Sequence, residues 1–240
     1  MRCAVFSDVH GNLEALQAVL EKIALLSPDR ILCLGDVVGY GADPNGCVQA
    51  VQKHADAVLA GNHDWAALGL EDTCRFNPAA RVAAQWTREE LGTDEALFLR
   101  MCPLVLEEGD VSLAHASPLN PSQWDYIPSP AWGRAALAES SCRLCFVGHS
   151  HRGFICAETG QQDRLSEGSV WLAQNMRYLV NVGSVGQPRD GDPRASFALW
   201  DQESGNIALH RVSYDIATAQ NKIRSKGLPD YLADRLAIGQ

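Results

Sequence analysis

Short apolar runs alternate with helical patterns at the start of the chain. Residues 13–26 carry apolar side chains at the spacing of an amphipathic helix. Asp43-Pro44 is typical of the start of a second helix, which we expect to reach about Lys53. Three β-prone apolar runs flank these helices, at residues 2–7, 30–34 and 57–60. This β-α-β-α-β order predicts parallel strands joined by right-handed crossovers.

The remainder of the chain predicts a change to antiparallel pairing. Residues 78–100 are helical in pattern, and residues 104–107 and 111–116 are typical of a hairpin. The further elements expected are a helix near 131–139, strands at 142–147, 153–157, 178–182, 196–201 and 206–213, and a helical tail from about 215. The sequence shows neither an internal repeat nor a long linker, so we expect residues 1–240 to form one domain.

Composition narrows the classes of function. With 240 residues and 46% hydrophobic content, the chain can build one large α/β core. A net charge of -9 argues against a surface that binds extended nucleic acid. We see no membrane segment or secretory signal and expect a cytoplasmic protein. Its eight cysteines, including the lone C-x-x-C pair Cys142 and Cys145, are then expected to be reduced core residues.

Five of the seven histidines lie in short motifs rich in Asp, Asn, His and Gly. The other two, His54 and His210, receive no role. The motifs are Asp8-Val9-His10, Gly35-Asp36, Gly61-Asn62-His63-Asp64, Ala114-His115-Ala116 and Gly148-His149-Ser150-His151. Each begins at or just past the end of a strand-like run. Because active crevices in α/β sheets lie at the carboxyl ends of strands, we expect these motifs to converge.

Oxygen and imidazole donors without cysteine suit hard and borderline divalent metals. A two-metal hydrolytic site needs a bridging carboxylate and several further donors for each ion. Seven side chains meet that requirement: Asp8, His10, Asp36, Asn62, His115, His149 and His151. Asp8 and His10 are two residues apart, like His149 and His151, so an extended backbone would aim both members of a pair the same way.

The ordered motifs resemble the calcineurin-like metallophosphoesterase superfamily. The resemblance spans residues 8–151, and residues 181–189 (NVGSVGQPR) resemble a late motif of its small bacterial and archaeal phosphodiesterase branch. It implies an α/β (α+β) fold, a four-layer αββα sandwich with two packed mixed β-sheets flanked by helices. It also implies two divalent metal ions, drawn from Mn, Fe, Ni and Zn.

The same resemblance implies a role for each residue of the motifs. His63 is not needed as a ligand and is expected to contact phosphate or to protonate the leaving oxygen, with Asp64 orienting it. The implied reaction is hydrolysis of a phosphoester by in-line attack of a metal-bound hydroxide. The implied ligands are Asp8, His10 and His151 for the first metal, Asn62, His115 and His149 for the second, and Asp36 as the bridge.

Two motif positions distinguish this chain from other branches of the same fold. Protein phosphatases and diadenosine tetraphosphatases of this fold usually read G-D-x-V-D-R-G and G-N-H-E, whereas this chain has Tyr40 for the arginine and Asp64 for the glutamate. Both departures argue against the protein and dinucleotide phosphatases and favour a phosphodiesterase, with a phosphomonoesterase of the same fold kept as an alternative. A non-catalytic scaffold is disfavoured because every expected ligand is present.

The substrate and its contacts stay open at this point. The expected partner is a small phosphoester, with nucleotide-derived compounds among the candidates, and the sequence predicts no oligomeric state. Arg189 could contact phosphate or form an ordinary surface ion pair. Trp124 and Tyr126 could line a substrate pocket or pack under the loop of residues 117–130.

Overall fold

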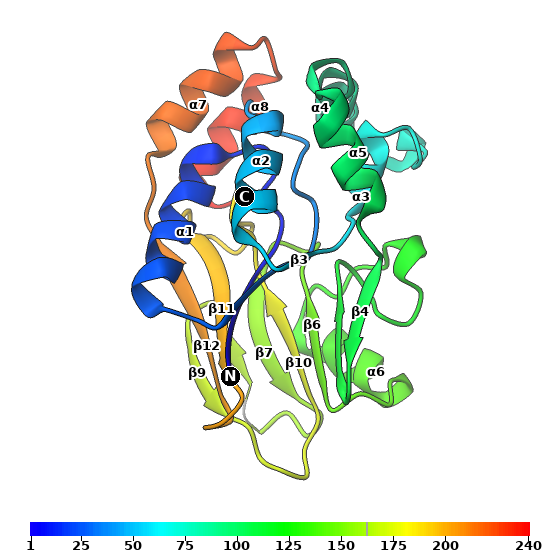
Figure 1. Ribbon diagram of the computed structural model, residues 1–240, viewed down its shortest axis with the longest axis vertical. Coiled ribbons are helices and arrows are strands. Elements are labelled where there is room, and N and C mark those ends of the chain that lie inside the picture. The colour runs from blue at the N-terminus through cyan, green and yellow to red at the C-terminus, as the bar shows by residue number, and fades with distance from the viewer. Residues whose placement is uncertain (162) are drawn as a thin grey trace.

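Two mixed β-sheets pack against each other in the computed structural model, which describes residues 1–161 and 163–240 (Figure 1). The first sheet consists, in spatial order, of β3 (Ala57–Val58), β2 (Arg30–Cys33), β1 (Arg2–Phe6), β11 (Ala195–Asp201), β12 (Asn206–Val212) and β9 (Gly168–Trp171). The second consists of β4 (Val105–Glu108), β5 (Val111–Ala114), β6 (Leu144–Val147), β10 (Tyr178–Val182), β7 (Gly153–Ala157) and β8 (Arg164–Leu165).

Each sheet combines a parallel half with an antiparallel half. β1, β2 and β3 pair in parallel, as the sequence predicts. β5, β6 and β10 form the parallel half of the second sheet. β11 and β12 pair antiparallel beside β1, and β7 pairs antiparallel with β10. The parallel strands of both sheets are the ones that carry the motifs, so their carboxyl ends decide where the functional side chains lie.

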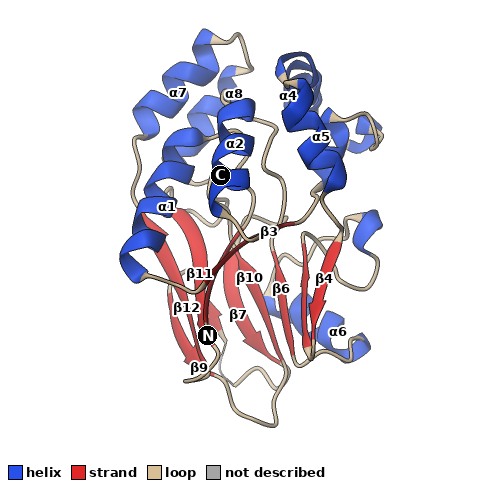
Figure 2. Cartoon of the chain, in the orientation of Figure 1, coloured by secondary structure: helices blue, strands red, loops and turns tan. Residues whose placement is uncertain are grey.

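Helices cover the outer faces of both sheets. The helix α1 packs on β11 and β12, and α6 packs on β7 and β10 of the other sheet. Figure 2 shows α6 beside the strands, apart from the other helices. The α-helices are α1 (Leu13–Leu26), α2 (Pro44–His54), α3 (Asn62–Ala67), α4 (Pro78–Glu90), α5 (Thr93–Met101), α6 (Pro130–Glu139), α7 (Ile216–Ser225) and α8 (Asp230–Asp234). Three short 3-10 turns complete the elements: η1 (Thr73–Arg75), η2 (Pro121–Gln123) and η3 (Arg235–Ile238). The expected four-layer αββα sandwich is therefore confirmed.

Burial on both faces explains why β1 is apolar without alternation. Val5 belongs to the cluster between the two sheets, whereas Phe6 belongs to the cluster under α1 and α2. Between the sheets, Phe146 of β6 meets Trp200 of β11, with ring centroids 5.5 Å apart. The core thus joins the two sheets directly behind the strands that lead to the motifs.

Several expectations differ from the structure in detail. The helical pattern of residues 78–100 is divided into α4 and α5, because the backbone is extended at Leu91 and Gly92 and the Gly92 N–H is held by Asn45 Oδ1 at 2.8 Å. The short strands β8 and β9 and the helix α3 were not predicted. Asp215 caps α7, as an Asp before the first turn of a helix is expected to do. Asp43 precedes α2 but makes no capping hydrogen bond and instead accepts one from Lys222.

The structure describes the state of the cysteines and the apolar content of the helices. All eight cysteines are free thiols. Five of them are buried, including Cys145, and Cys102 and Cys142 are half-buried. Cys74 is exposed, so the expected core position is wrong for this residue. Over residues 1–161 and 163–240, no helix has the length and apolar content that crossing a bilayer requires.

Truncating Phe146 tests the junction between the sheets. Phe146→Ala should lower the free energy of unfolding by about 3–5 kcal/mol, because a fully buried ring is replaced by a cavity. Denaturant titration in the presence of chelator measures this change. Leu25 is 81% exposed on α1, so Leu25→Ala is the matched control and should change the value by less than about 0.5 kcal/mol. Equal losses for the two variants would contradict the placement of Phe146.

Candidate metal centre

The predicted motifs meet where the parallel strands of the two sheets end. Asp8 follows β1, Asp36 follows β2, and Asn62 starts α3 just after β3. The second sheet contributes His115 after β5, and His149 and His151 after β6. All of these side chains are buried, and none is more than 6% exposed. The expected convergence is therefore observed, with the carboxylates coming from one sheet and three imidazoles from the other.

Left-handed backbone, not strand alternation, aims the paired ligands. Six non-glycine residues of the motifs have φ between 51° and 62°: Asp8, His10, Asp36, Tyr40, His149 and His151. The expectation that an extended backbone aims Asp8 with His10, and His149 with His151, is therefore wrong. Asp and His tolerate this region better than bulky or β-branched residues do. Strained backbone of this kind costs free energy and concentrates at functional sites.

Two triads of potential ligands form in this region. In each triad, one ligand atom from each residue lies within 4.8 Å of the others: Asp8 with His10 and His151, and Asp36 with His115 and His149. Their imidazole nitrogens face one another, with 3.1 Å between His10 Nε2 and His151 Nε2 and 3.2 Å between His115 Nε2 and His149 Nδ1. Asp36 Oδ2 lies near both triads, 3.5 Å from His10 Nε2 and 3.3 Å from His115 Nε2.

Each carboxylate is held at one oxygen and left without a partner at the other. Asp8 Oδ2 accepts from the His149 N–H at 3.0 Å, and Asp36 Oδ1 accepts from the His63 N–H at 2.8 Å. Among the described residues, no hydrogen bond reaches buried Asp8 Oδ1, Asp36 Oδ2, Asn62 Oδ1 or His149 Nε2. Buried polar atoms normally have partners. A pair of divalent cations coordinated by N and O atoms fits these unpartnered atoms.

Backbone carbonyls set the orientation of three imidazoles. Nδ1 of His10 lies 3.1 Å from Val38 O, Nδ1 of His115 lies 3.1 Å from Leu34 O, and Nδ1 of His151 lies 2.6 Å from Gln187 O. Because a carbonyl oxygen only accepts, Nδ1 of each ring carries a proton, so a ring that binds a cation would do so through Nε2. Metal-binding histidines are commonly held in this way.

The electrostatics of the cluster are dominated by burial and by the two carboxylates. Burial opposes the ionisation of Asp8, but His151 and His115 keep its pKa well below the usual range. Burial also opposes the charge of His115, yet Asp36 and Asp8 outweigh it and raise its pKa to about 9. Burial lowers the pKa of His149 to about 3, assisted by the charge of His115. The carboxylates therefore form a buried negative centre that calls for a counter-charge.

Two glycines allow the backbone to approach these carboxylates closely. A Cβ at position 61 would overlap Asp36 Oδ1, and a Cβ at position 148 would overlap the side chains of Ser7 and Asp8. Side chains at these positions would therefore displace Asp8 or Asp36.

The expected partnership of His63 and Asp64 is corrected by the structure. Asp64 Oδ1 accepts from the Val38 N–H at 3.1 Å, and Asp64 Oδ2 accepts from the Gly61 N–H at 3.0 Å. His63 Nδ1 has no hydrogen-bond partner in the part of the chain that the structure describes. Since both Asp64 oxygens face backbone N–H groups, Asp64 holds two of the motif loops together and does not orient His63.

His63 itself lies beside the first triad. Its ring centroid is 4.9 Å from that of His10, 4.4 Å from Tyr40 and 4.6 Å from Phe76. Burial lowers its pKa well below the usual value. His63 is thus adjacent to the potential ligands, as expected of a residue that contacts the substrate.

The late motif, residues 181–189, holds in place the turns that carry the potential ligands, a role that the sequence did not reveal. Asn181 Nδ2 donates to Gly148 O at 2.8 Å and to Ser150 Oγ at 2.9 Å, which fixes the turn that carries His149 and His151. Ser184 Oγ donates to Asp8 O at 2.8 Å. Residues 181–189 therefore act mainly as a scaffold for turns that lie far away in the sequence.

Arg189 places a cation at the edge of the cluster. Its backbone N–H donates to His151 O at 3.0 Å, and its guanidinium carbon lies 5.5 Å from the centroid of the Tyr40 ring. Gln187 Oε1 accepts from Arg189 Nε and Nη2 at 3.3 and 2.8 Å. No carboxylate among the described residues pairs with Arg189, so the surface ion pair considered from the sequence is not formed.

Trp124 and Tyr126 have different roles. Trp124 is 9% exposed, donates from Nε1 to Glu71 Oε2 at 2.9 Å, and meets Trp65 edge to face at 5.3 Å. It packs the loop of residues 117–130 onto the protein. Tyr126 is 54% exposed, and its ring stacks on that of His149 with centroids 3.9 Å apart.

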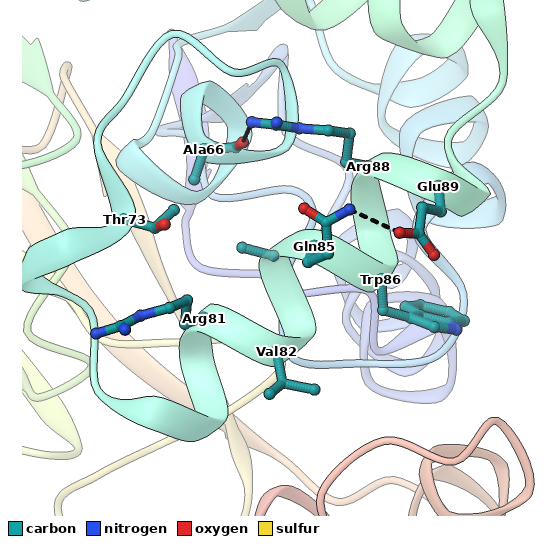
Figure 3. A pocket seen from close by; sticks show the side chains of 9 residues that line it. Ala66, Thr73, Arg81, Val82, Gln85, Trp86, Arg88 and Glu89 are labelled. Atoms are coloured by element: carbon teal, nitrogen blue, oxygen red, sulfur yellow. Dashed lines mark hydrogen bonds between the residues drawn. The ribbon is translucent and has the colours of Figure 1, made fainter.

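A cavity of about 540 Å³, lined by residues of α3, η1 and α4, lies outside the cluster (Figure 3). Its arginines serve the backbone: Arg88 donates to Ala66 O and Ala67 O, and Arg81 donates to Cys74 O and Phe76 O. Gln85 and Glu89 are paired with each other, as Figure 3 shows. The polar groups of this cavity are therefore already used by the fold.

Known proteins resemble this chain over most or all of its length. A metallophosphoesterase from Sphaerobacter thermophilus is 38% identical, with a TM-score of 0.88 over 100% of this chain and 99% of that one. An uncharacterized protein of Methanocaldococcus jannaschii is 41% identical over 99% of this chain and 98% of its own length. The symmetrical bis(5'-nucleosyl)-tetraphosphatase of Chromohalobacter salexigens is 26% identical over 76% of this chain and 66% of its own.

The family profile agrees with these similarities. The profile of the calcineurin-like phosphoesterase superfamily domain matches residues 1–205, which include every motif described above. The chain therefore belongs to the calcineurin-like phosphoesterase superfamily.

Proposed function

We propose that the protein is a binuclear metal-dependent phosphodiesterase that acts on a small phosphoester. The family supports phosphoester hydrolysis in general, and the finer activity is our inference. The observation that carries this proposal is the pair of buried carboxylates, Asp8 and Asp36, each within a triad of N and O donors and each with one oxygen that has no hydrogen-bond partner among the described residues. Two such triads side by side match the requirement for a pair of cations that clamps a phosphoryl group.

The proposed ligand sets follow the triads. Asp8, His10 and His151 would hold one cation, and His115, His149 and Asn62 the other. Asp36 would bridge, which its Oδ2 supports by lying close to a histidine of each triad. Asn62 joins the second set because its buried Oδ1 has no partner among the described residues. When bound, the cations would acidify a water molecule and offset negative charge on the phosphoryl oxygens.

The chain's own residues would orient the substrate. His63 would donate a hydrogen bond or a proton to a substrate oxygen, because it adjoins the first triad. Arg189 would direct its guanidinium to a phosphoryl oxygen, since Gln187 fixes it and no carboxylate of the described chain neutralises it. Asp64 would act as a positioning residue by joining the loops at Val38 and Gly61.

A dinucleotide phosphatase is the second candidate, favoured by the similarity to the Chromohalobacter enzyme. Tyr40 argues against it, because the arginine typical of that branch is replaced. Arg189 weakens this argument, since it brings a guanidinium to within 5.5 Å of the Tyr40 ring centroid. We favour a phosphodiesterase because the motif also departs from the phosphatase pattern at Asp64.

Metal dependence tests the proposed function directly. Chelator-treated protein should fail to hydrolyse bis-p-nitrophenyl phosphate, and Mn²⁺ should restore activity as about two ions bind per chain. Asp36→Asn should lower bound metal and reduce turnover roughly 100-fold or more. Asp110 is exposed in the turn between β4 and β5, at the other end of β5 from His115, and pairs with Arg143 at the surface. Asp110→Asn is therefore the control and should keep wild-type metal content and turnover. Activity that persists in chelator would contradict the proposal. Faster hydrolysis of the monoester p-nitrophenyl phosphate than of the diester would contradict the diesterase part.

His63 separates substrate contact from metal binding. His63→Ala should keep about two metal ions per chain, yet lose roughly 10²–10⁴-fold in kcat, because it contacts substrate rather than cation. Metal analysis and steady-state kinetics on the same samples check this. His54→Ala, on the exposed end of α2, serves as the control and should retain full turnover. Wild-type kcat in His63→Ala would show that the assigned role is wrong.

A further inference from the structure

A cavity of about 550 Å³ shares a wall with the candidate metal centre. The shared wall is Tyr126, which lines the cavity and stacks on His149 at 3.9 Å with an interplanar angle of 24°. Ser117, two residues after His115, also lines it. A volume of this size holds a ligand group larger than a phosphate. An ester bound at the metal centre could therefore extend its organic part into this cavity.

The cavity presents aromatic surface that the fold leaves exposed. Trp132 is 61% exposed, Tyr126 is 54% exposed and Leu119 is 36% exposed, and all three line this one cavity. Aromatic side chains grouped in a concave site favour flat apolar ligands, because stacking adds to the burial of area. We call this site the Tyr126–Trp132 pocket.

The loop that carries Tyr126 is held in place before any ligand binds. Trp124 anchors it through Glu71 and Trp65, and adopts a left-handed backbone with φ of 58°. The Ser117 N–H donates to Asp125 O at 3.2 Å, which closes the loop on itself. A preorganised wall loses little entropy on binding, so the pocket is suited to ligand recognition.

The polar groups of the pocket select against a second phosphate. Asp125 and Glu139 line it, and neither forms an ion pair within the described part of the chain. No lysine or arginine is among the described residues that line it. Carboxylates accept hydrogen bonds and repel anions, so a flat group that carries N–H donors and no negative charge fits this site.

We propose that the Tyr126–Trp132 pocket binds the base of a nucleoside phosphoester whose phosphate lies at the metal centre. The inference rests on the proposed function, because it takes the metal centre as the site of the phosphate. Bases with an exocyclic amino group fit the carboxylates of Asp125 and Glu139 better than uracil does. Trp132 is then a specificity residue for the organic part of the substrate.

Binding of AMP and ribose 5-phosphate to Mn²⁺-loaded protein tests this proposal, because ribose 5-phosphate keeps the sugar and phosphate of AMP but carries a hydroxyl in place of the base. Isothermal titration should give AMP a dissociation constant roughly tenfold or more below that of ribose 5-phosphate, as expected for stacking on an aromatic ring. AMP should also bind more tightly than UMP. In Trp132→Ala the ratio between AMP and ribose 5-phosphate should fall close to one. Trp171→Ala removes a Trp that is 65% exposed on β9 and should leave the ratio unchanged.

The outcomes separate the pocket from the activity. Equal affinities for AMP and ribose 5-phosphate would overturn the pocket proposal, as would a ratio that Trp132→Ala does not change. Absence of binding by either ligand would overturn it too, and so would a dimer that Trp132→Ala dissociates. Protein that hydrolyses bis-p-nitrophenyl phosphate but shows equal affinities keeps the proposed function and loses the pocket. Protein that prefers AMP but hydrolyses no phosphoester keeps the pocket and loses the proposed function.

Discussion

The burial of two carboxylates, Asp8 and Asp36, is the constraint on which the rest of the structure depends. Each has one oxygen anchored by a backbone N–H and another that lacks a hydrogen-bond partner among the described residues. Removing a carboxylate from water costs several kcal/mol unless opposite charge and hydrogen bonds are supplied. The surrounding histidines, close glycines and left-handed turns are the local structure that such burial requires, and a bound cation pair would complete it.

The packing between the sheets determines how the carboxylates meet their partners. Asp8 and Asp36 end strands of the first sheet, whereas His115 and His149 follow strands of the second. Each triad therefore takes ligands from both sheets, and its geometry depends on the core between the sheets, where Phe146 meets Trp200. Because interiors are close-packed, a change in that core would displace the ligands of each triad relative to one another. Stability and site geometry are thus coupled in this fold.

The sequence predicted the features that depend on local pattern or on motif order. The parallel start and the convergence of strand ends are observed, and the six Asp and His residues predicted as ligands are the ones that make up the two triads. The aim of His10 and His151 was explained wrongly, since single residues in the left-handed region leave no periodic signal. The strand β8 has only two residues and β9 buries only Val170, so neither carries an apolar pattern. The break at Gly92 depends on Asn45, a contact distant in sequence. The hydrogen bond from the Val38 N–H to Asp64 was missed for the same reason.

Tyr40 shows why a motif comparison alone is insufficient at this site. In the sequence motif, Tyr40 occupies the position of an arginine, so the motif lacks that positive charge. In the fold, Arg189 arrives from the loop after β10 and faces the Tyr40 ring, so the charge is supplied from another part of the chain. The cation then approaches from the side of His151. Because Tyr126 covers His149 in the other triad, the loops after β5 and β10 both border the cluster. In the proposed function, substrate selection would therefore depend on these loops more than on the motifs that would hold the metal.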